Sequence, residues 1–426
     1  MPSISHIKKC DDATFPLFCI KVVSVSAYSP SLGGFSFGNE KKRLFRLQFS
    51  RLFRTFAIKN RSMTTVAPFA RPFYMMAKSV GATCNLACGY CYYLEKGKLY
   101  EGAGRTMMSD EVLERFVQQY LESQANTEVL FTWHGGEPLL QPRTFYEKAM
   151  RLQRRYAEGR HVDNCLQTNG TLLTDDWCRF FRDNGWLIGI SIDGPEHLHD
   201  AFRRNRNGDP TFRQVMRGIE LLEKHGVMWN ALATVNAVTV EEPEAVYQFF
   251  RRMGCKYIQF TPVGPPEPGQ ISAEAWGRFL CRVFDAWEKS DVGEVFVNIF
   301  EATLANYLGV TPGMCAMSDL CGHVGAVEWN GDVYSCDHFV FPQHRLGNLC
   351  QKTLYEMMHS EQQRAFARQK TDGLPQTCKD CRWLFTCHGE CPRNRQCLCE
   401  GYRQYFEHAD AFMKQMRDDI WKENGM

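Results

Sequence analysis

The sequence predicts an α/β protein: part of a barrel of six parallel strands, each followed by a helix, and then a smaller cysteine-rich domain. Apolar strand patterns alternate with amphipathic helix patterns from Phe73 to about residue 290. Polar or glycine-rich segments follow the first four strands, as at the active face of such folds. After about residue 310 the alternation gives way to short cysteine-rich segments.

The six strand patterns are short and apolar, and each is followed by a pattern of helical period. We expect strands at 73–78, 129–133, 164–168, 186–192, 228–236 and 257–263. We expect helices at 110–122, 144–156, 174–184, 211–224, 242–252 and 273–290. Right-handed crossovers between these units would close the sheet into a barrel or part of one.

The composition excludes several classes of protein. The chain has 426 residues with 50 basic and 48 acidic side chains, so its net charge of +2 favours neither nucleic acid nor an anionic membrane. It has no uninterrupted apolar run of about 18 residues, which a spanning helix requires. Its 19 cysteines are too dilute for a disulfide-stapled scaffold, and their clustering favours metal binding in a reducing cytoplasm.

These patterns divide the chain into three regions. Residues 1–62 form a basic extension, residues 63–308 the partial barrel, and residues 309–426 the cysteine-rich domain with a C-terminal helix. The extension resembles a targeting or surface-binding segment because it is rich in arginine and poor in acids. We favour another interpretation, in which the extension is disordered or not translated and Met63 is the initiator, because globular patterning begins only near residue 67.

Two groups of cysteines have the spacing of metal ligands. Cys84, Cys88 and Cys91 stand in one loop directly after the first strand. Three thiolates on a tight loop can hold three irons of a [4Fe–4S] cluster and leave the fourth iron open for chemistry. The alternatives are a zinc site that lacks its fourth ligand, or core cysteines. The second group lies between Cys378 and Cys399 and is too dense for chance, with a zinc ribbon as its alternative.

CNLACGYCYY (84–93) together with GGEP (135–138) resembles the radical S-adenosylmethionine (SAM) superfamily. More narrowly, residues 64–420 resemble the anaerobic sulfatase-maturating enzymes, which carry a C-terminal SPASM domain. The stretches that carry this resemblance include FTWHGGEP, QTNGTLLTD, SIDGPEHLHDAFR, GDVYSCDHFVFPQHRLGNL and CKDCRWLFTCHGECPRNR. The resemblance therefore covers nearly the whole chain beyond the extension.

The resemblance implies SAM and three [4Fe–4S] clusters as cofactors. The first cluster would be held by Cys84, Cys88 and Cys91. The first auxiliary cluster would use Cys315, Cys321, Cys336 and Cys391. The second auxiliary cluster would use Cys378, Cys381, Cys387 and Cys399. Cys397 is the alternative to Cys399, and the link from Cys391 to Cys399 is shorter here than in the family.

The resemblance also implies a set of residues that bind SAM. Glycines at 135 and 136 would let the backbone approach SAM closely, since neither has a Cβ. Arg203 would pair with the SAM carboxylate through its bidentate fork, the alternative being a solvated helix residue. The complete set implied for cofactor binding is Tyr90, Gly135, Gly136, Glu137, Ser191, Arg203 and Gly264.

Asp337 follows Cys336 and matches the aspartate that acts in the family as the catalytic base toward the substrate thiol or hydroxyl. We expect burial beside the cluster to raise its pKa toward neutrality. Asp337 as a turn residue is one alternative. His338 as the base is another, since its ordinary pKa also suits that role.

The resemblance implies an anaerobic sulfatase maturase, a radical SAM oxidoreductase that forms a 5′-deoxyadenosyl radical. This radical would oxidise a Cys, or a Ser, of a sulfatase to Cα-formylglycine. The partners implied are an unfolded sulfatase polypeptide with a Cys/Ser-x-Pro-x-Arg segment and a low-potential electron donor of flavodoxin or ferredoxin type. The alternatives are another SPASM-type peptide maturase that forms thioether or carbon–carbon crosslinks, and a non-enzymatic zinc-binding scaffold.

Overall fold

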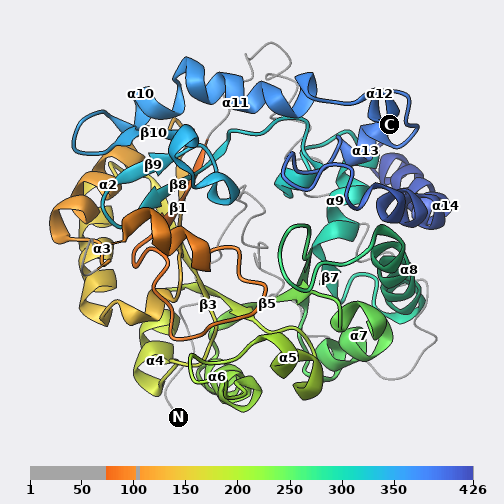
Figure 1. The fold of residues 1–426 in the computed structure, drawn as a ribbon, viewed down its shortest axis with the longest axis horizontal. Helices are drawn as coiled ribbons and strands as arrows, with labels where there is room; N and C mark the ends of the chain where they lie inside the picture. The colour runs from red at the N-terminus through yellow and green to blue at the C-terminus, as the bar shows by residue number, and fades with distance from the viewer. Residues whose placement is uncertain (1–72, 102–105, 426) are drawn as a thin grey trace.

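The computed structural model describes residues 73–101 and 106–425, so the predicted basic extension at 1–62 lies outside the described residues. Its strands form one continuous sheet in the order β10-β9-β8-β1-β2-β3-β4-β5-β6-β7. Figure 1 shows this sheet as an inner wall with helices around it. The predicted α/β class with a partial parallel barrel is confirmed.

The six predicted strands are all present and pair in parallel from β1 to β6. Alternating inward and outward side chains and short apolar runs made them recognisable. A further short strand, β7 (Phe296–Val297), pairs in parallel with β6 and was not predicted. The six run as β1 (Tyr74–Lys78), β2 (Glu128–His134), β3 (His161–Thr168), β4 (Leu187–Ser191), β5 (Met228–Val235) and β6 (Tyr257–Pro262).

The six predicted helices cover the outside of these strands (Figure 1). Side-chain caps begin several of them: the hydroxyls of Ser109, Thr174 and Ser272 accept from backbone N–H groups in the first turn. The helices are α2 (Asp110–Glu122), α3 (Arg143–Tyr156), α4 (Asp175–Asp183), α6 (Phe212–His225), α7 (Pro243–Arg252) and α8 (Ala273–Ser290). The short α5 (Glu196–Phe202), between β4 and α6, was not predicted.

The cysteine-rich region extends the barrel sheet. β8 (Val324–Glu328) pairs in parallel with β1, and β9 (Asp332–Tyr334) joins it to β10 (Arg345–Asn348) through antiparallel pairing. Because β1 and β8 are neighbours, the end of β1 faces the segment that holds Cys336 and Asp337. The boundary predicted at 308/309 stays a prediction, and the sheet crosses it.

The C-terminal helix α14 (Cys399–Glu423) packs against α8 and against α9 (Asn298–Tyr307), as Figure 1 shows for α8. Buried side chains of β8, β9 and α14 belong to the same hydrophobic core as those of the barrel strands. This region therefore packs on the barrel. The remaining helices of this region are α10 (Leu354–Met358), α11 (Glu361–Asp372), α12 (Gln376–Lys379) and α13 (Leu384–Cys387).

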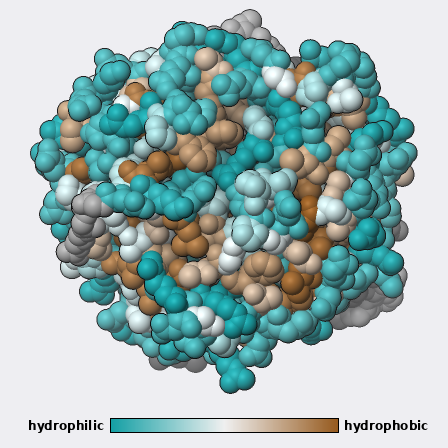
Figure 2. Space-filling view, in the orientation of Figure 1, coloured by the Kyte–Doolittle hydropathy of each residue, from teal (hydrophilic) through white to brown (hydrophobic). Residues whose placement is uncertain are grey.

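On the face shown in Figure 2, hydrophilic residues cover most of the periphery, and hydrophobic residues gather toward the middle. Figure 2 shows the molecule from the same side as Figure 1, so these hydrophobic residues lie over the middle of the ribbon drawing. None of the described helices is both long enough and apolar enough to cross a membrane.

Candidate active site

The three-cysteine loop follows β1 at the carboxyl end of the parallel strands. Cys88 is buried, Cys84 and Cys91 are half-buried, and the three thiols lie close enough to interact electrostatically. Burial raises the pKa of Cys84 to about 12 and that of Cys88 to about 11. Only a ligand with strong positive charge, such as iron or zinc, would displace these protons at neutral pH.

The HGGEP loop after β2 packs directly on the segment that leads to the cysteines. The Gly136 N–H donates to the Gly81 carbonyl at 2.7 Å, and the Glu137 N–H donates to the Thr83 carbonyl at 2.9 Å. A Cβ on Gly136 would stand 2.0 Å from the Thr83 oxygen, a distance that no side chain tolerates. Gly136 is therefore explained by its contact with the protein's own cysteine loop. The predicted contacts of Gly135 and Gly136 with SAM stay predictions.

Glu137 is fully buried, and its carboxylate binds groups of the protein interior. It accepts hydrogen bonds from the N–H of Leu139 at 2.9 Å, the N–H of Asn169 at 2.8 Å and the hydroxyl of Thr168 at 2.7 Å. Burial raises the pKa of Glu137 to about 7, an effect that these donors partly offset. Glu137 thus joins the segment after β2 to the segment after β3, while its predicted role toward SAM stays a prediction.

The TNG segment after β3 reaches the first cysteine. The Asn169 amide donates to the Cys84 sulfur at 3.8 Å and to the Asn85 side chain at 2.9 Å. The Leu86 N–H also donates to the Cys84 sulfur, at 3.3 Å. Hydrogen bonds to ligand sulfurs orient them and tune the potential of an iron–sulfur cluster. Asn169 was not among the predicted site residues, although the TNG sequence was visible.

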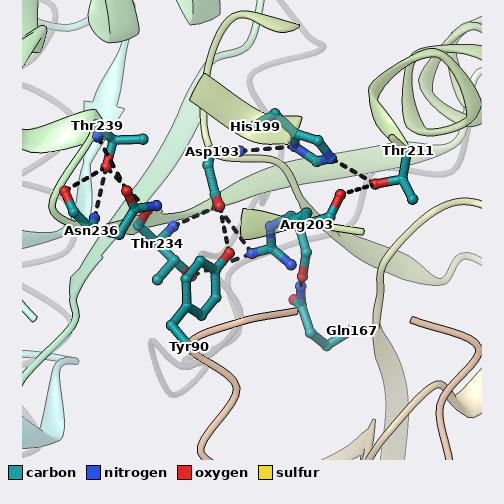
Figure 3. Close-up of polar contacts among 10 residues, drawn as sticks. Tyr90, Gln167, Asp193, His199, Arg203, Thr211, Thr234, Asn236 and Thr239 are labelled. Atoms are coloured by element: carbon teal, nitrogen blue, oxygen red, sulfur yellow. Dashed lines mark hydrogen bonds and ion pairs between the residues drawn. The ribbon is translucent and has the colours of Figure 1, made fainter. Parts of the chain in front are cut away.

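Asp193, Arg203 and Tyr90 form a buried network beside Cys88 (Figure 3). Arg203 Nη2 lies 3.0 Å from Asp193 Oδ1, and the Tyr90 hydroxyl donates to Asp193 Oδ2. The guanidinium charge also lies close enough to the Cys88 thiol to oppose the rise in its pKa. Arg203 is only 7% exposed, which rules out the alternative of a solvated helix residue.

Ser191 lies at the end of β4, where the side-chain amide of Gln167 donates to its hydroxyl at 3.0 Å. A Cβ at Gly189 would lie 1.9 Å from the Gln167 side-chain oxygen. The glycine at this position of β4 therefore leaves room for the Gln167 side chain to reach Ser191 on the same strand. Gly264, after β6, is similarly explained: a Cβ there would lie 2.9 Å from the Asn394 side-chain oxygen.

Asp337 lies in a buried cluster of charged and aromatic residues at the ends of β1 and β2. Its Oδ1 forms an ion pair with the Lys78 ammonium, and the Tyr92 hydroxyl donates to Oδ2 at 2.6 Å. Lys78 Nζ also lies 3.1 Å from His134 Nδ1. Lys78, His134 and Tyr92 were not predicted as site residues, because only the fold brings them to Asp337.

The expectation that burial raises the pKa of Asp337 is wrong. Burial alone would raise it, but the positive charge of the neighbouring Lys78 ammonium outweighs burial and holds the pKa below its ordinary value. Burial lowers the pKa of His134 to about 3, so this imidazole is neutral. Asp337 is therefore ionised and held in a fixed position.

His338, the alternative base, lies between Asp337 and an auxiliary cysteine. Its Nδ1 is 3.9 Å from the Cys391 sulfur, and its ring meets that of Tyr92 edge-on at 5.3 Å between centroids. Burial lowers the pKa of His338. On the other side of Lys78, the Tyr93 hydroxyl donates to the buried carboxylate of Glu328.

The structure brings together the four cysteines predicted for the first auxiliary cluster. The Cys336 thiol lies close enough to interact electrostatically with those of Cys315 and Cys391, and the Cys391 thiol does so with that of Cys321. Burial raises the pKa of Cys315 to about 11 and that of Cys391 to about 12. These cysteines come from η5 (Cys315–Met317), the turn after it, the end of β9 and the segment before α14.

The second predicted set also gathers in one place. The Cys399 thiol, at the start of α14, interacts electrostatically with those of Cys378 and Cys381, and the Cys387 thiol interacts with that of Cys399. Cys397 is exposed, and its thiol donates to the Arg395 carbonyl instead. The short link 392–398 is therefore long enough to bring Cys399 to the other three.

These three sets of thiols fit iron–sulfur clusters in number and position. Within residues 73–101 and 106–425, no three His, Cys, Asp or Glu side chains converge on a point that suits a single metal ion. Each thiolate of a [4Fe–4S] cluster binds a different iron, so its ligands surround the cluster. Beside the first set, Arg203 Nε is buried and has no hydrogen-bond partner among the described residues, an exception that a bound anion would explain.

Sequence comparison identifies two domains. The radical SAM superfamily matches residues 79–250, which include the three-cysteine loop and Arg203. The iron–sulfur cluster-binding domain SPASM matches residues 321–382, which include Cys336 and Asp337.

Relatives match over most of their length. The chain is 52% identical to the serine-type anaerobic sulfatase-maturating enzyme of Bacteroides thetaiotaomicron, over 84% of this chain and 94% of that protein. It is 32% identical to the cysteine-type enzyme of Clostridium perfringens, over 79% and 96% respectively. A solved structure of native anSMEcpe with bound AdoMet has 30% identity and a TM-score of 0.75, over 82% of this chain and 100% of that one. The chain belongs to the anaerobic sulfatase-maturating enzymes of the radical SAM superfamily.

Proposed function

We propose that this protein oxidises a serine in an unfolded sulfatase segment to Cα-formylglycine. The observation that carries the proposal is the position of Asp337. It is a buried, ionised carboxylate at the same end of the sheet as the three-cysteine loop and Arg203. A carboxylate there can accept a hydroxyl proton from a substrate that enters over the carboxyl ends of the strands.

Cys84, Cys88 and Cys91 would hold the first [4Fe–4S] cluster, and Arg203 would pair with the carboxylate of SAM. When bound, the cluster and SAM supply the 5′-deoxyadenosyl radical that removes a Cβ hydrogen from the substrate residue. The chain's own contribution is to orient these groups. The Asn169 amide donates to the Cys84 sulfur, and the Arg203 guanidinium lies beside Cys88. Glu137 links the loop after β2 to the loop after β3, and both loops pack on the cysteine segment.

Asp337 accepts the proton that leaves the substrate hydroxyl. Lys78 keeps the carboxylate ionised, and the Tyr92 hydroxyl fixes its second oxygen, so that its orientation is set before substrate binds. The auxiliary cysteine sets would hold two further clusters, which would supply an acceptor for the second electron from the substrate. Cys336 and Asp337 are adjacent, so the proton and the electron would leave the substrate on the same side.

Serine is the proposed substrate residue, because relatives named serine-type share more of this sequence than those named cysteine-type. Two serine-type enzymes from Klebsiella are 37–38% identical to this chain, whereas the cysteine-type enzymes are 30–32% identical. The reductant is proposed to be a low-potential flavodoxin or ferredoxin, since the radical step needs an electron of low potential.

The experiment is an anaerobic incubation of the reconstituted enzyme with SAM, a strong reductant and matched Ser-x-Pro-x-Arg and Cys-x-Pro-x-Arg peptides. Formylglycine formation lowers the mass of the serine peptide by about 2 Da and that of the cysteine peptide by about 18 Da. The proposal predicts turnover of the serine peptide. If both peptides kept their mass while SAM was cleaved, the proposal would be contradicted.

A further inference from the structure

Asp193 is a completely buried carboxylate that the proposed function does not use directly. It stands just after β4, in the DGP segment, and three groups from different parts of the barrel donate to it (Figure 3). They are the Thr234 N–H on β5 at 2.9 Å, the Tyr90 hydroxyl in the cysteine loop, and Arg203 Nη2 after α5 at 3.0 Å. A carboxylate held by a backbone group, a hydroxyl and a guanidinium cannot change its position without breaking several bonds.

Arg203 has a long, flexible side chain, and its contacts lie on two sides. On one side Nη2 meets Asp193 and, at 3.3 Å, the Thr234 hydroxyl. On another side the guanidinium lies close enough to the Cys88 thiol to lower its pKa, and Arg203 Cζ lies 5.5 Å from the centre of the Tyr90 ring. Its Nε remains buried and without a partner among the described residues. Asp193 therefore fixes the guanidinium while leaving a donor unused.

The backbone of Asp193 and the helix after it are fixed as well. The Asp193 N–H donates to His199 Nδ1 at 3.4 Å, and His199 Nε2 lies 3.2 Å from the Thr211 hydroxyl. That hydroxyl donates to the Arg203 carbonyl at 2.8 Å. Figure 3 shows that Asp193 and Arg203 are linked twice: directly through their side chains, and from backbone to backbone through the side chains of His199 and Thr211.

We propose that Asp193 is the positioning residue of the SAM subsite: it holds the Arg203 guanidinium beside Cys88 so that the unused donor meets the SAM carboxylate. Through Tyr90, the same carboxylate also sets the distance between Arg203 and the cysteine loop. The proposal rests on the proposed function, in which Arg203 binds that carboxylate. Pre-orientation of a bidentate donor raises affinity because the ligand need not order the arginine itself.

The test is the SAM dissociation constant of the reconstituted Asp193→Asn variant, measured anaerobically by equilibrium dialysis. The amide keeps the shape of Asp193 but loses its charge for Arg203. We expect SAM binding to weaken about tenfold or more, with the iron content and the KM for peptide unchanged. SAM binding at the wild-type affinity would overturn the proposal.

A matched control exists at the other end of the barrel. Asp291 is also buried, and it accepts from the Tyr247 hydroxyl at 2.8 Å and from Arg251 Nε at 3.0 Å. It lies after α8, whereas the cysteine loop follows β1. Asp291→Asn should change stability without changing the SAM dissociation constant. An equal loss of SAM affinity in both variants would mean that Asp193 acts only through overall stability, which contradicts the proposal.

A double-mutant cycle tests whether Asp193 acts through Arg203. In an Arg203→Met background, Asp193→Asn should have almost no further effect on SAM affinity, because the group it positions is gone. Additive losses would contradict the proposal. If Asp193→Asn does not fold, Tyr90→Phe removes one of the three donors and should weaken SAM binding by a smaller factor, while wild-type affinity in it would count against the proposal. Failure of the wild-type enzyme itself to bind SAM would instead refute the proposed function.

Discussion

The Asp337 carboxylate forms an ion pair with the Lys78 ammonium, and both groups are almost completely buried. Lys78 is the last residue of β1, and Asp337 begins η6 (Asp337–Phe339) directly after Cys336. The pair exists because β8 lies beside β1 in the sheet, which brings the SPASM hairpin to the end of the first barrel strand. It therefore links the two domains at the proposed site of proton transfer.

Asp337→Asn should abolish product formation without disturbing the clusters. The amide cannot accept the substrate proton, so formylglycine formation should fall by roughly 10²–10⁴. Iron content and SAM cleavage should stay at wild-type levels, since the amide keeps the shape of the carboxylate and its oxygen can still accept from the Tyr92 hydroxyl. The measurement is the ratio of formylglycine to 5′-deoxyadenosine. A normal yield of product would place the base elsewhere, with His338 the next candidate.

Cys399→Ser should remove about four irons per chain, because one ligand of the second auxiliary set is lost. Cys397→Ser is the matched control, since Cys397 is exposed and lies only two residues away. It should keep the wild-type iron content. Iron analysis of both variants after anaerobic purification checks the assignment, and the reverse pattern would show that Cys397 is the ligand.

Gly136→Ala should destabilise the cysteine loop. The added Cβ would stand 2.0 Å from the Thr83 oxygen and 2.4 Å from the Thr83 carbonyl carbon, both backbone atoms. The loop must shift, so we expect a lower melting temperature and incomplete loading of the first cluster. Gly97→Ala is the control, because among the described residues a Cβ there meets only Ala82, at an ordinary 3.8 Å. Equal behaviour of the two variants would contradict the role of the contact.

Glu301→Gln, in α9, should stabilise the protein at alkaline pH. Burial raises the pKa of Glu301 to about 8 from an ordinary 4.5, and its Oε2 has no partner among the described residues. The folded state therefore keeps a proton that the unfolded state loses, and stability falls as pH rises from 4.5 through about 8.

The glutamine stays neutral, so its advantage should be near zero at pH 4.5 and reach roughly 1–3 kcal/mol at pH 8. Melting temperatures of variant and wild type at both pH values check this. Glu220→Gln, on the exposed side of α6, should show no such dependence. A gain that does not change with pH would refute burial of the carboxyl group as the cause.

The barrel units and the cysteine sets could be predicted from sequence because their signals are local. Each strand and helix has its own period, and the ligand spacings are short. The joining of β8 to β1 could not be predicted, since the alternation ends before β8 and parallel pairing leaves no local mark.

The proton-transfer site was only half predictable for the same reason. Asp337 was found from its position after Cys336, but Lys78 looked like the polar end of a strand. The predicted direction of the Asp337 pKa shift was therefore wrong. The sequence indicated that Asp337 would be buried, but it did not indicate that the Lys78 ammonium would be buried beside it. Asp193 had a signal in the DGP segment, yet its partners on β5 and in the cysteine loop become evident only in the folded chain.

The most direct test of the central claim uses a peptide that carries deuterium at both Cβ positions of the target serine. The account predicts that 5′-deoxyadenosine gains one deuterium for each formylglycine formed, because the radical made at the three-cysteine site takes its hydrogen from Cβ. The Cys88→Ser variant should form neither product. Formylglycine accompanied by unlabelled 5′-deoxyadenosine would contradict the account.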